Sequence, residues 1–179
     1  MNYLIEDENF LTEEEKNYID NNFQYIPFYY TKRIGVYRRD APVMCHSLVK
    51  RADDPKVDHT KDRSTSSYTN FFLNILIRFT QKYNIAFDKV LRGSINITCK
   101  VKWDKTIVHV DHKIPHSVFM LYLGEEVHGN LNVYEEDKET LIKTIKPKNY
   151  KIVCFGENVP HQFEYPKQGL RRALVFTFN

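Results

Sequence analysis

After residue 90 the chain is a series of short apolar or alternating segments separated by polar, turn-forming residues. The breaks include Glu135–Lys138, Pro147–Asn149 and Pro166–Gly169. Eight strands at this spacing predict a mainly β body, either a barrel or a double-sheet jelly roll. The predicted strands cover residues 91–101, 106–110, 117–123, 130–134, 140–145, 151–155, 161–165 and 171–178.

Two helices are expected to precede these strands. Thr12 and Glu15 have the spacing of a capping box, and an apolar stripe follows them. Between Ser67 and Tyr83, apolar residues recur at steps of three and four, which predicts a second amphipathic helix. The polar stretch between the helices, residues 50–67, predicts a long loop that is either disordered or a lid over a binding site.

The 179 residues correspond to one domain by the usual relation between chain length and domain number. We therefore expect a single domain over residues 1–179. In it, residues 1–90 supply helices, loops and the candidate lid, and residues 91–179 form the β core. The expected fold class is mainly β with two or three supporting α-helices.

The net charge of +3 is far below that of a dedicated nucleic-acid binder. Residues 31–63 are locally basic, with nine Lys and Arg against five Asp, but such a run usually forms a solvated face. Nucleic acid is therefore not the expected partner. The alternative, a nucleic-acid binder that uses this segment, predicts strongly salt-dependent binding without a metal requirement.

Three cysteines, Cys45, Cys99 and Cys154, form no C-x-x-C pair. Cys99 and Cys154 lie in strand-like apolar runs, where a thiol behaves as a small hydrophobic side chain. No stretch approaches the length of a membrane span, and the first residues lack a signal-peptide pattern. These features predict an intracellular, cytoplasmic protein with reduced cysteines and no membrane partner.

The segment His109-Val110-Asp111 presents an imidazole and a carboxylate two residues apart. In a strand, such residues project from the same face and reach one point. His161, which opens a later strand after Val159-Pro160, is a plausible third ligand. Two His and one carboxylate leave three octahedral positions open, as in non-haem Fe(II) oxygenases, whereas a structural zinc site needs four protein ligands.

Gly169-Leu170-Arg171 follows His161 by about one strand length and opens the last predicted strand. An Arg inside an alternating apolar run must form an ion pair or meet a buried anion, because an unpaired buried charge is costly. A dicarboxylate co-substrate satisfies that need through a bidentate interaction.

Residues 91–179 resemble, in order, the Fe(II)- and 2-oxoglutarate-dependent dioxygenases, and within them the prolyl 4-hydroxylase-like branch with its small phage and bacterial members. His109–Asp111 is similar to the family's H-x-D, and Leu121–Gly124 to its Y-L-N strand end. The remaining similar segments are Gly129–Leu131 at the place of G-G-x-T, Ile145–Phe155, Pro160-His161 and Gly169–Arg171.

The resemblance implies a double-stranded β-helix, the cupin-like jelly roll, with Fe(II) held by the catalytic residues His109, Asp111 and His161. It also implies that Arg171 binds the distal carboxylate of 2-oxoglutarate and that the Tyr122 hydroxyl is a second contact. The implied reaction consumes O₂ and 2-oxoglutarate, releases succinate and CO₂, and hydroxylates a C–H bond. Ascorbate is a further candidate cofactor, and its use is left open.

The chain departs from the family pattern at three places. Asn130 and Asn132 replace small or hydroxyl residues, so the wall of the cofactor pocket is expected to differ in detail. Arg172 adjoins Arg171, and strand alternation allows only one of them to face inward; the G-x-R spacing favours Arg171. The second Arg of the DNA-repair demethylases is absent six residues later, which disfavours that branch.

The expected substrate is a peptide or protein that is hydroxylated on a prolyl-type side chain. A small-molecule substrate is the alternative. Tyr37 and Arg38, in a cluster of aromatic and basic residues before the long loop, and His112, just after the H-x-D pair, are the candidate substrate contacts. The competing hypothesis is a non-catalytic, cupin-like metal-binding module of a larger assembly. The oligomeric state is left open.

Overall fold

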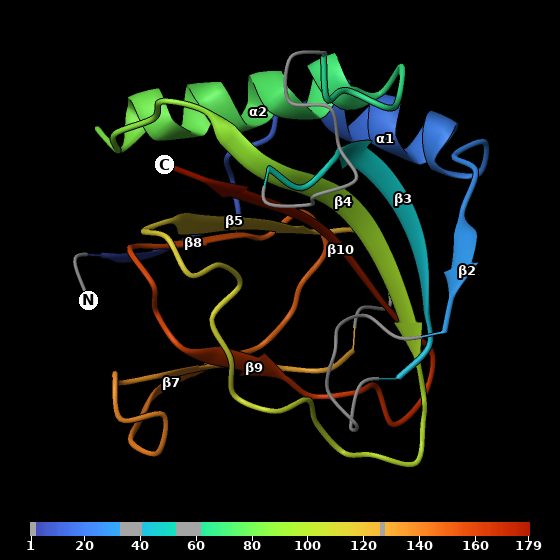
Figure 1. The fold of residues 1–179 in the computed structure, drawn as a ribbon. Coiled ribbons are helices and arrows are strands. Elements are labelled where there is room, and N and C mark those ends of the chain that lie inside the picture. The colour runs from blue at the N-terminus through green and yellow to red at the C-terminus, as the bar shows by residue number, and fades with distance from the viewer. Residues whose placement is uncertain (1–2, 33–40, 53–61, 126–127) are drawn as a thin grey trace.

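The computed structural model describes residues 3–32, 41–52, 62–125 and 128–179, which form two packed β-sheets with two α-helices against one of them (Figure 1). The helices are α1 (Glu13–Phe23) and α2 (Thr69–Lys82). The strands are β1 (Leu4–Asp7), β2 (Tyr29–Thr31), β3 (Val43–Val49), β4 (Val90–Cys99), β5 (Ser117–Tyr122), β6 (Leu131–Tyr134), β7 (Leu141–Ile145), β8 (Ile152–Phe155), β9 (His161–Phe163) and β10 (Leu170–Phe178).

The larger sheet has the strand order β1-β8-β5-β10-β4-β3-β2, and the smaller has β7-β6-β9. All pairings between neighbouring strands are antiparallel. From β5 onward, successive strands alternate between the two sheets except at the β6–β7 hairpin, and this alternation is the jelly-roll arrangement. The mainly β, double-stranded β-helix prediction is confirmed.

The two helices cover the outer face of the larger sheet (Figure 1). The capping box of Thr12 and Glu15 is present at the start of α1. In α2 the apolar residues at helical spacing are buried against the sheet, with Phe72 and Phe79 among them. A second apolar cluster lies between the sheets and includes Val153 and Phe155 of β8. The polar site described below therefore occupies only part of the space between the sheets.

Seven of the eight predicted strands form, and the strand over residues 106–110 does not. That segment still runs along β9, through isolated bridges of Lys105 with Glu164 and of His109 with His161. The Thr106 hydroxyl accepts a hydrogen bond from the Phe163 backbone at 3.1 Å, and the Thr106 carbonyl accepts one from the Gln162 side chain at 2.5 Å. Side-chain hydrogen bonds thus replace part of the ladder that a regular strand would make.

Three strands that periodicity did not predict, β1, β2 and β3, form before residue 90 and join the larger sheet. The long-loop prediction falls partly on residues 53–61, which lie outside the described residues, as does the lid hypothesis. Arg63, just after these residues, donates hydrogen bonds to the backbone carbonyls of Lys50, Val90 and Leu91. No helix in the described part of the chain is long and apolar enough to cross a membrane.

Candidate metal and co-substrate site

Three side chains meet between the two sheets with the composition of a metal site. One nitrogen or oxygen atom from each of His109, Asp111 and His161 lies within 4.8 Å of the other two. His109 and His161 are held side by side by two backbone hydrogen bonds, each of 2.9 Å, from one residue's N–H to the other's carbonyl. The sequence motif and the distant histidine are therefore brought together as predicted.

The hydrogen bonds of the two imidazoles leave one ring nitrogen of each directed at this cluster. Nδ1 of His109 lies 3.0 Å from the Ile107 carbonyl, and Nδ1 of His161 lies 3.0 Å from the Val159 carbonyl. A carbonyl can only accept, so each Nδ1 carries the proton and each Nε2 presents a lone pair. Metal-binding histidines are commonly fixed in this way by a hydrogen bond from the second nitrogen.

The charge states of the cluster also suit a cation. Burial and the neighbouring His109 lower the pKa of His161 to about 4, so its ring is neutral at neutral pH. Burial would by itself raise the pKa of the Asp111 carboxyl, but opposing charges, of which the Arg92 guanidinium has the largest effect, hold that pKa well below its usual range. An ionised carboxylate and a neutral imidazole are the forms that bind divalent metals.

A buried guanidinium lies further along the inner face of the larger sheet. Arg171 of β10 is 2% exposed, and its Nε has no hydrogen-bond partner among the described residues. Its guanidinium carbon lies 4.5 Å from the centroid of the Phe163 ring and 5.4 Å from that of Tyr122. Within the described ranges no carboxylate pairs with it, and its guanidinium donates a hydrogen bond to the Met120 sulfur at 3.2 Å. A buried cation with so few polar partners fits a site for an anion.

Two buried hydroxyls without hydrogen-bond partners flank Arg171. They belong to Tyr122 of β5 and Thr98 of β4, and Thr98 is the direct cross-strand partner of Arg171. Burial raises the pKa of the Tyr122 hydroxyl, and the charge of Arg171 opposes that effect in part. The hydroxyl is therefore a neutral donor beside the guanidinium. Sequence analysis did not identify Thr98 as a site residue, because its position beside Arg171 depends on the pairing of β4 with β10.

The glycine of Gly129-Asn130-Leu131 keeps this corner open. Gly129 has φ of +86°, and a Cβ there would lie 2.1 Å from the Glu164 carbonyl oxygen and 3.3 Å from Cδ of Arg171. Only glycine adopts this conformation without strain, and only glycine fits the space. Asn130 and Asn132, which depart from the family pattern, share one partner: the side-chain amides of both donate to the carboxylate of Glu164, the residue that follows β9.

Arg172 takes the opposite side of β10. Its guanidinium carbon lies 5.6 Å from the centroid of the Phe23 ring of α1, on the face covered by the helices. Alternation along the strand therefore turns Arg171 towards the space between the sheets and Arg172 away from it. This arrangement agrees with the preference for Arg171 that the G-x-R spacing indicated.

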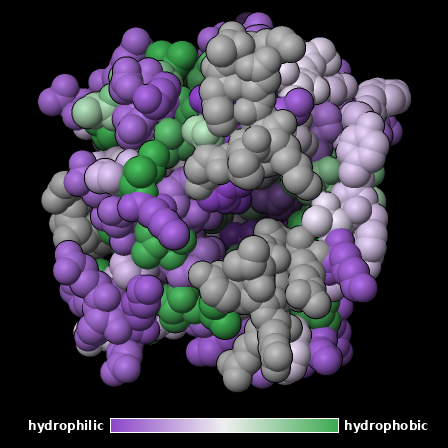
Figure 2. Space-filling view, viewed as in Figure 1, coloured by the Kyte–Doolittle hydropathy of each residue, from purple (hydrophilic) through white to green (hydrophobic). Residues whose placement is uncertain are grey.

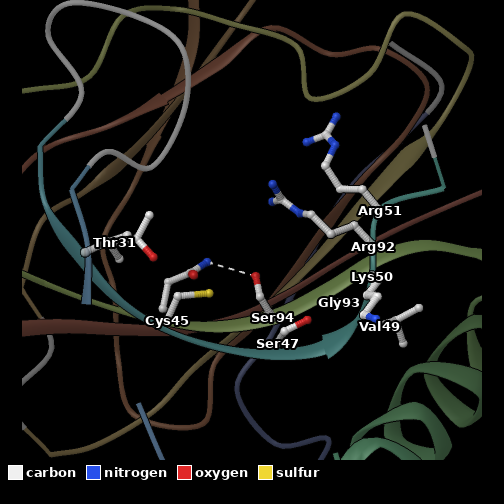
Figure 3. Close-up of a pocket in the computed structure, with 11 residues that line it drawn as sticks. Thr31, Cys45, Ser47, Val49, Lys50, Arg51, Arg92, Gly93 and Ser94 are labelled. Carbon is white, nitrogen blue, oxygen red and sulfur yellow. Dashed lines mark hydrogen bonds between the residues drawn. The ribbon is translucent and has the colours of Figure 1, made fainter. Parts of the chain in front are cut away.

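A polar pocket adjoins the metal cluster on the side of β3 and β4. In the view of Figure 1, the surface between the sheets is hollowed and its walls are hydrophilic (Figure 2). The pocket is lined by Thr31, Val43, Cys45, Ser47, Val49, Lys50, Arg51, Arg92, Gly93, Ser94 and Asn96 (Figure 3). Arg92 connects it to the metal cluster, because its Nη2 lies 3.6 Å from Oδ1 of Asp111.

Arg51 connects the same pocket to the loop that carries the metal ligands. Its Nη2 donates to the Asp111 backbone carbonyl at 2.9 Å and lies 3.1 Å from Nδ1 of His112. His112 is buried, and its Nε2 is 2.8 Å from the Thr177 hydroxyl. Sequence reasoning did not single out Arg51 or Arg92 as site residues, since neither belongs to a motif and only the β3–β4 pairing brings them together.

The three predicted substrate contacts stay predictions. Tyr37 and Arg38 lie outside the described residues. His112 lies beside the site but is enclosed by Arg51 and Thr177, so the contact that the structure shows for it is with the protein itself.

Known structures share this architecture. An oxidoreductase of the 2OG-Fe(II) oxygenase family from Burkholderia pseudomallei matches with a TM-score of 0.74 and 14% identity, over 98% of this chain and 84% of its own. A prolyl hydroxylase from Trichoplax adhaerens, in complex with a peptide fragment of the hypoxia inducible factor oxygen degradation domain, matches with a TM-score of 0.60 and 14% identity, over 99% and 84%. A non-heme alpha-ketoglutarate-dependent carbocyclase from nogalamycin biosynthesis matches with a TM-score of 0.64 and 12% identity, over 98% and 78%.

The chain has the fold of the 2OG-Fe(II) oxygenases. No protein-family model matches the sequence, and no curated protein matches it either. The oxygenase fold extends over nearly the whole chain, including β1, β2, β3 and both helices. Residues 1–90 are therefore part of the shared architecture and do not form an addition to it.

Proposed function

We propose that this protein is an Fe(II)- and 2-oxoglutarate-dependent dioxygenase that hydroxylates a C–H bond of its substrate. The observation that carries the proposal is the presence of two incomplete sites in the space between the sheets. A metal cluster with only three protein ligands and a buried guanidinium that has no carboxylate partner among the described residues both lie between the sheets. A metal together with a dicarboxylate would complete both.

The residues present fit both groups. His109, Asp111 and His161 would hold Fe(II), since two imidazoles and a carboxylate are the protein ligands of non-haem Fe(II) oxygenases. Arg171 would bind the distal carboxylate of 2-oxoglutarate, with the Tyr122 hydroxyl as a second donor and Thr98 as a third. When bound, the metal and co-substrate would supply O₂ activation coupled to release of succinate and CO₂, with one oxygen atom transferred to the substrate.

The protein's own contribution is orientation and exclusion of water. The hydrogen bonds to the Ile107 and Val159 carbonyls hold the two imidazoles in one tautomer. Apolar side chains from β5 and β8, including Val118 and Phe155, pack between the sheets and exclude water there. Such positioning is the part of the chemistry that the chain itself provides.

A cupin-like, non-catalytic metal-binding module is the competing hypothesis. Such a module needs the three metal ligands but has no use for a buried guanidinium flanked by buried, unpartnered hydroxyls. Arg171, Tyr122 and Thr98 therefore favour the dioxygenase.

Substrate class is not decided by the fold. The prolyl hydroxylase from Trichoplax adhaerens is described with a peptide, and this supports a peptidyl, prolyl-type substrate. The carbocyclase from nogalamycin biosynthesis has the same fold and a different activity. The prolyl-type substrate therefore stays a hypothesis, as do a role for ascorbate and a cytoplasmic location.

An anaerobic titration tests the proposal. Fe(II) and then 2-oxoglutarate are added to the purified metal-free protein, and the visible charge-transfer band of the chelated complex is recorded. We expect a band in the wild type, its loss in His161→Ala, and a shift to about tenfold or higher 2-oxoglutarate concentration in Arg171→Ala, which removes a charge-assisted ion pair.

Folding of each variant is verified by circular dichroism before titration. Arg172→Ala is the matched control, because it removes the adjacent charge from the opposite face of β10 and is expected to leave the band unchanged. A folded wild-type protein that shows no band would refute the dioxygenase proposal and leave the metal-binding module.

A further inference from the structure

The pocket beside the metal cluster is strongly polar for a substrate pocket. Two guanidinium groups, from Arg51 and Arg92, extend from its wall in the same direction (Figure 3). Lys50 is a further residue of the pocket wall. The rest of the wall is mainly hydroxyl, amide and thiol groups, and no described acidic side chain lines it. Most ligand pockets are lined chiefly by apolar groups, so this composition points to a charged ligand.

Arg92 is a largely buried cation in this pocket with few protein partners. Its Nε is buried without a hydrogen-bond partner, and its one ion-pair contact is the 3.6 Å approach to Oδ1 of Asp111. That distance exceeds a normal hydrogen bond. Arg51, in contrast, is engaged with the Asp111 carbonyl and with His112. Arg92 therefore has donor capacity that the described protein groups do not use.

Metal binding would engage the negative charge of Asp111, the acidic group that approaches Arg92. In the proposed holoenzyme, Fe(II), the Asp111 carboxylate, 2-oxoglutarate and the Arg171 guanidinium together carry no net charge. Arg92 would then remain as an uncompensated cation at the edge of the site, where part of its side chain is buried. An uncompensated, partly buried guanidinium is unfavourable, and an anionic ligand would relieve it.

Neutral donors lie on the same face of the same strand. Arg92, Ser94 and Asn96 alternate along β4, so their side chains project to one side. The Asn96 amide donates to the Ser94 oxygen at 3.2 Å and so does not use the Ser94 hydroxyl proton, which lies beside the Cys45 thiol. Ser47 of β3 is the cross-strand partner of Ser94 and lines the pocket as well.

Cys45 is unsuited to chemistry of its own here. Burial raises the pKa of its thiol, and the charge of Arg92 only partly opposes that rise. The thiol is therefore protonated at neutral pH and is a poor nucleophile. Recognition by charge and hydrogen bonding is the function that this wall supports.

We infer that Arg92 binds an oxyanionic group of the substrate, a carboxylate or a phosphate, with Ser94 and Ser47 as neighbouring donors. The inference rests on the proposed function in so far as it names the substrate of that site. Because Arg92 also adjoins Asp111, the bound anion would place a nearby C–H bond of the substrate against the metal. This substrate class differs from an uncharged prolyl side chain.

The test uses small anions as probes. The ¹⁵N-labelled protein is loaded with Zn(II), a diamagnetic substitute for iron, and with 2-oxoglutarate. Sodium acetate and sodium sulfate are then titrated separately at constant ionic strength. Acetate represents a carboxylate, sulfate represents a tetrahedral phosphate, and acetamide is the uncharged counterpart of acetate. The backbone amide signals of Ser47, Ser94 and Asn96 are followed.

We expect saturable shifts of these amides with at least one anion and none with acetamide. Arg92→Gln should raise the dissociation constant for that anion about tenfold or more, because a charge-assisted hydrogen bond is lost. Arg92→Lys keeps the charge but loses the planar guanidinium, so its dissociation constant for the anion should lie between those of the wild type and Arg92→Gln. Arg78→Gln is the control: it removes the same charge from α2, where Arg78 pairs with Glu15, and should leave the dissociation constant for the anion unchanged.

Three results would overturn the inference: no saturable shift with either anion, equal shifts with acetamide, or an anion affinity that Arg92→Gln leaves unchanged in a folded protein. The anion that binds more tightly decides between a carboxylate and a phosphate substrate. Failure of the proposed function is a separate result, because it is seen as a missing charge-transfer band with Fe(II) and 2-oxoglutarate whether or not the anion site exists.

Discussion

Several side chains at the site bury polar atoms that no described protein group satisfies. Arg171, Tyr122 and Thr98 carry buried polar atoms without hydrogen-bond partners. Each such atom destabilises the folded protein by about 1–3 kcal/mol relative to a satisfied one. Groups of this kind are tolerated where a ligand completes them, so their clustering on three adjacent strands is itself an argument for a binding site.

Replacing one of these groups should therefore affect stability and binding in opposite directions. Tyr122→Phe removes an unpartnered buried hydroxyl, and we expect the unliganded protein to be as stable as the wild type or more stable by up to about 1 kcal/mol. The same change should weaken 2-oxoglutarate binding about tenfold, because one donor to the carboxylate is lost. Urea unfolding and the charge-transfer titration measure the two effects.

Tyr83→Phe is the control for that substitution. The Tyr83 hydroxyl donates to Asp7 at 2.7 Å at the end of α2, on the outer face of the larger sheet. Its removal should lower the unfolding free energy and leave the affinity for 2-oxoglutarate unchanged. A Tyr122→Phe protein that loses stability but keeps its affinity would show that the hydroxyl has a structural role only.

Among the elements, the segment before the H-x-D motif is the one whose irregularity matters for the site. It aligns with β9 through bridges at its two ends and through the side chains of Thr106 and Gln162 between them. The second bridge is the His109–His161 pair, so the alignment of this segment sets the spacing of two metal ligands. A regular strand is not required to bring them together.

Thr106→Val tests that dependence with little change in volume. The Phe163 backbone N–H would lose the Thr106 oxygen as an acceptor at a buried position, so we expect unfolding free energy to fall by about 1–3 kcal/mol. Metal affinity should also fall, because the segment that carries His109 is less firmly held. Thr140→Val in an exposed turn, where Thr140 donates to Asp137, is the control and should leave metal affinity unchanged. Wild-type metal affinity in Thr106→Val would contradict the argument.

Across the whole molecule, the first strand fastens parts that are distant in the chain. β1 pairs with β8 at the edge of the larger sheet. Its Glu6 carboxylate bridges Lys143 of β7, in the smaller sheet, and Lys151 next to β8. Its Asp7 carboxylate accepts hydrogen bonds from Lys82 at 2.8 Å and from Tyr83 at 2.7 Å, both at the end of α2. One edge strand thus ties both sheets and a helix together.

This arrangement predicts an acid-dependent contribution to stability from Asp7. Burial would raise the pKa of its carboxyl, but the hydrogen bonds from Lys82 and Tyr83 outweigh it and keep the pKa below the usual 3.8. A carboxyl whose pKa is lower in the folded state binds fewer protons than in the unfolded state. Its stabilisation is therefore complete above the unfolded value and is lost as pH falls through the folded value.

Asp7→Asn should accordingly lower the unfolding free energy by about 1–2 kcal/mol at neutral pH. The difference from the wild type should shrink as pH falls below the usual carboxyl value and vanish once Asp7 is protonated. Urea unfolding across that pH range measures it. A difference that stays constant with pH would assign the effect to packing and not to charge.

Much of the fold was determined by local sequence. Periodicity of two and regular turn residues specify the seven strands β4 to β10, and the capping box and the apolar stripe specify α1 and α2. The metal ligands and Arg171 could also be identified from the sequence, because the H-x-D and G-x-R motifs fix the spacing of these residues along the chain. These features depend on residues that are close together in the chain.

The tertiary structure alone decided what depends on pairing between distant segments. It placed β1, β2 and β3 in the larger sheet and set Thr98 opposite Arg171. It also brought Arg51 and Arg92 to one pocket wall beside Asp111. Strand order and cross-strand register arise from packing of the whole chain, and no local pattern of side chains encodes which strand becomes the neighbour of which.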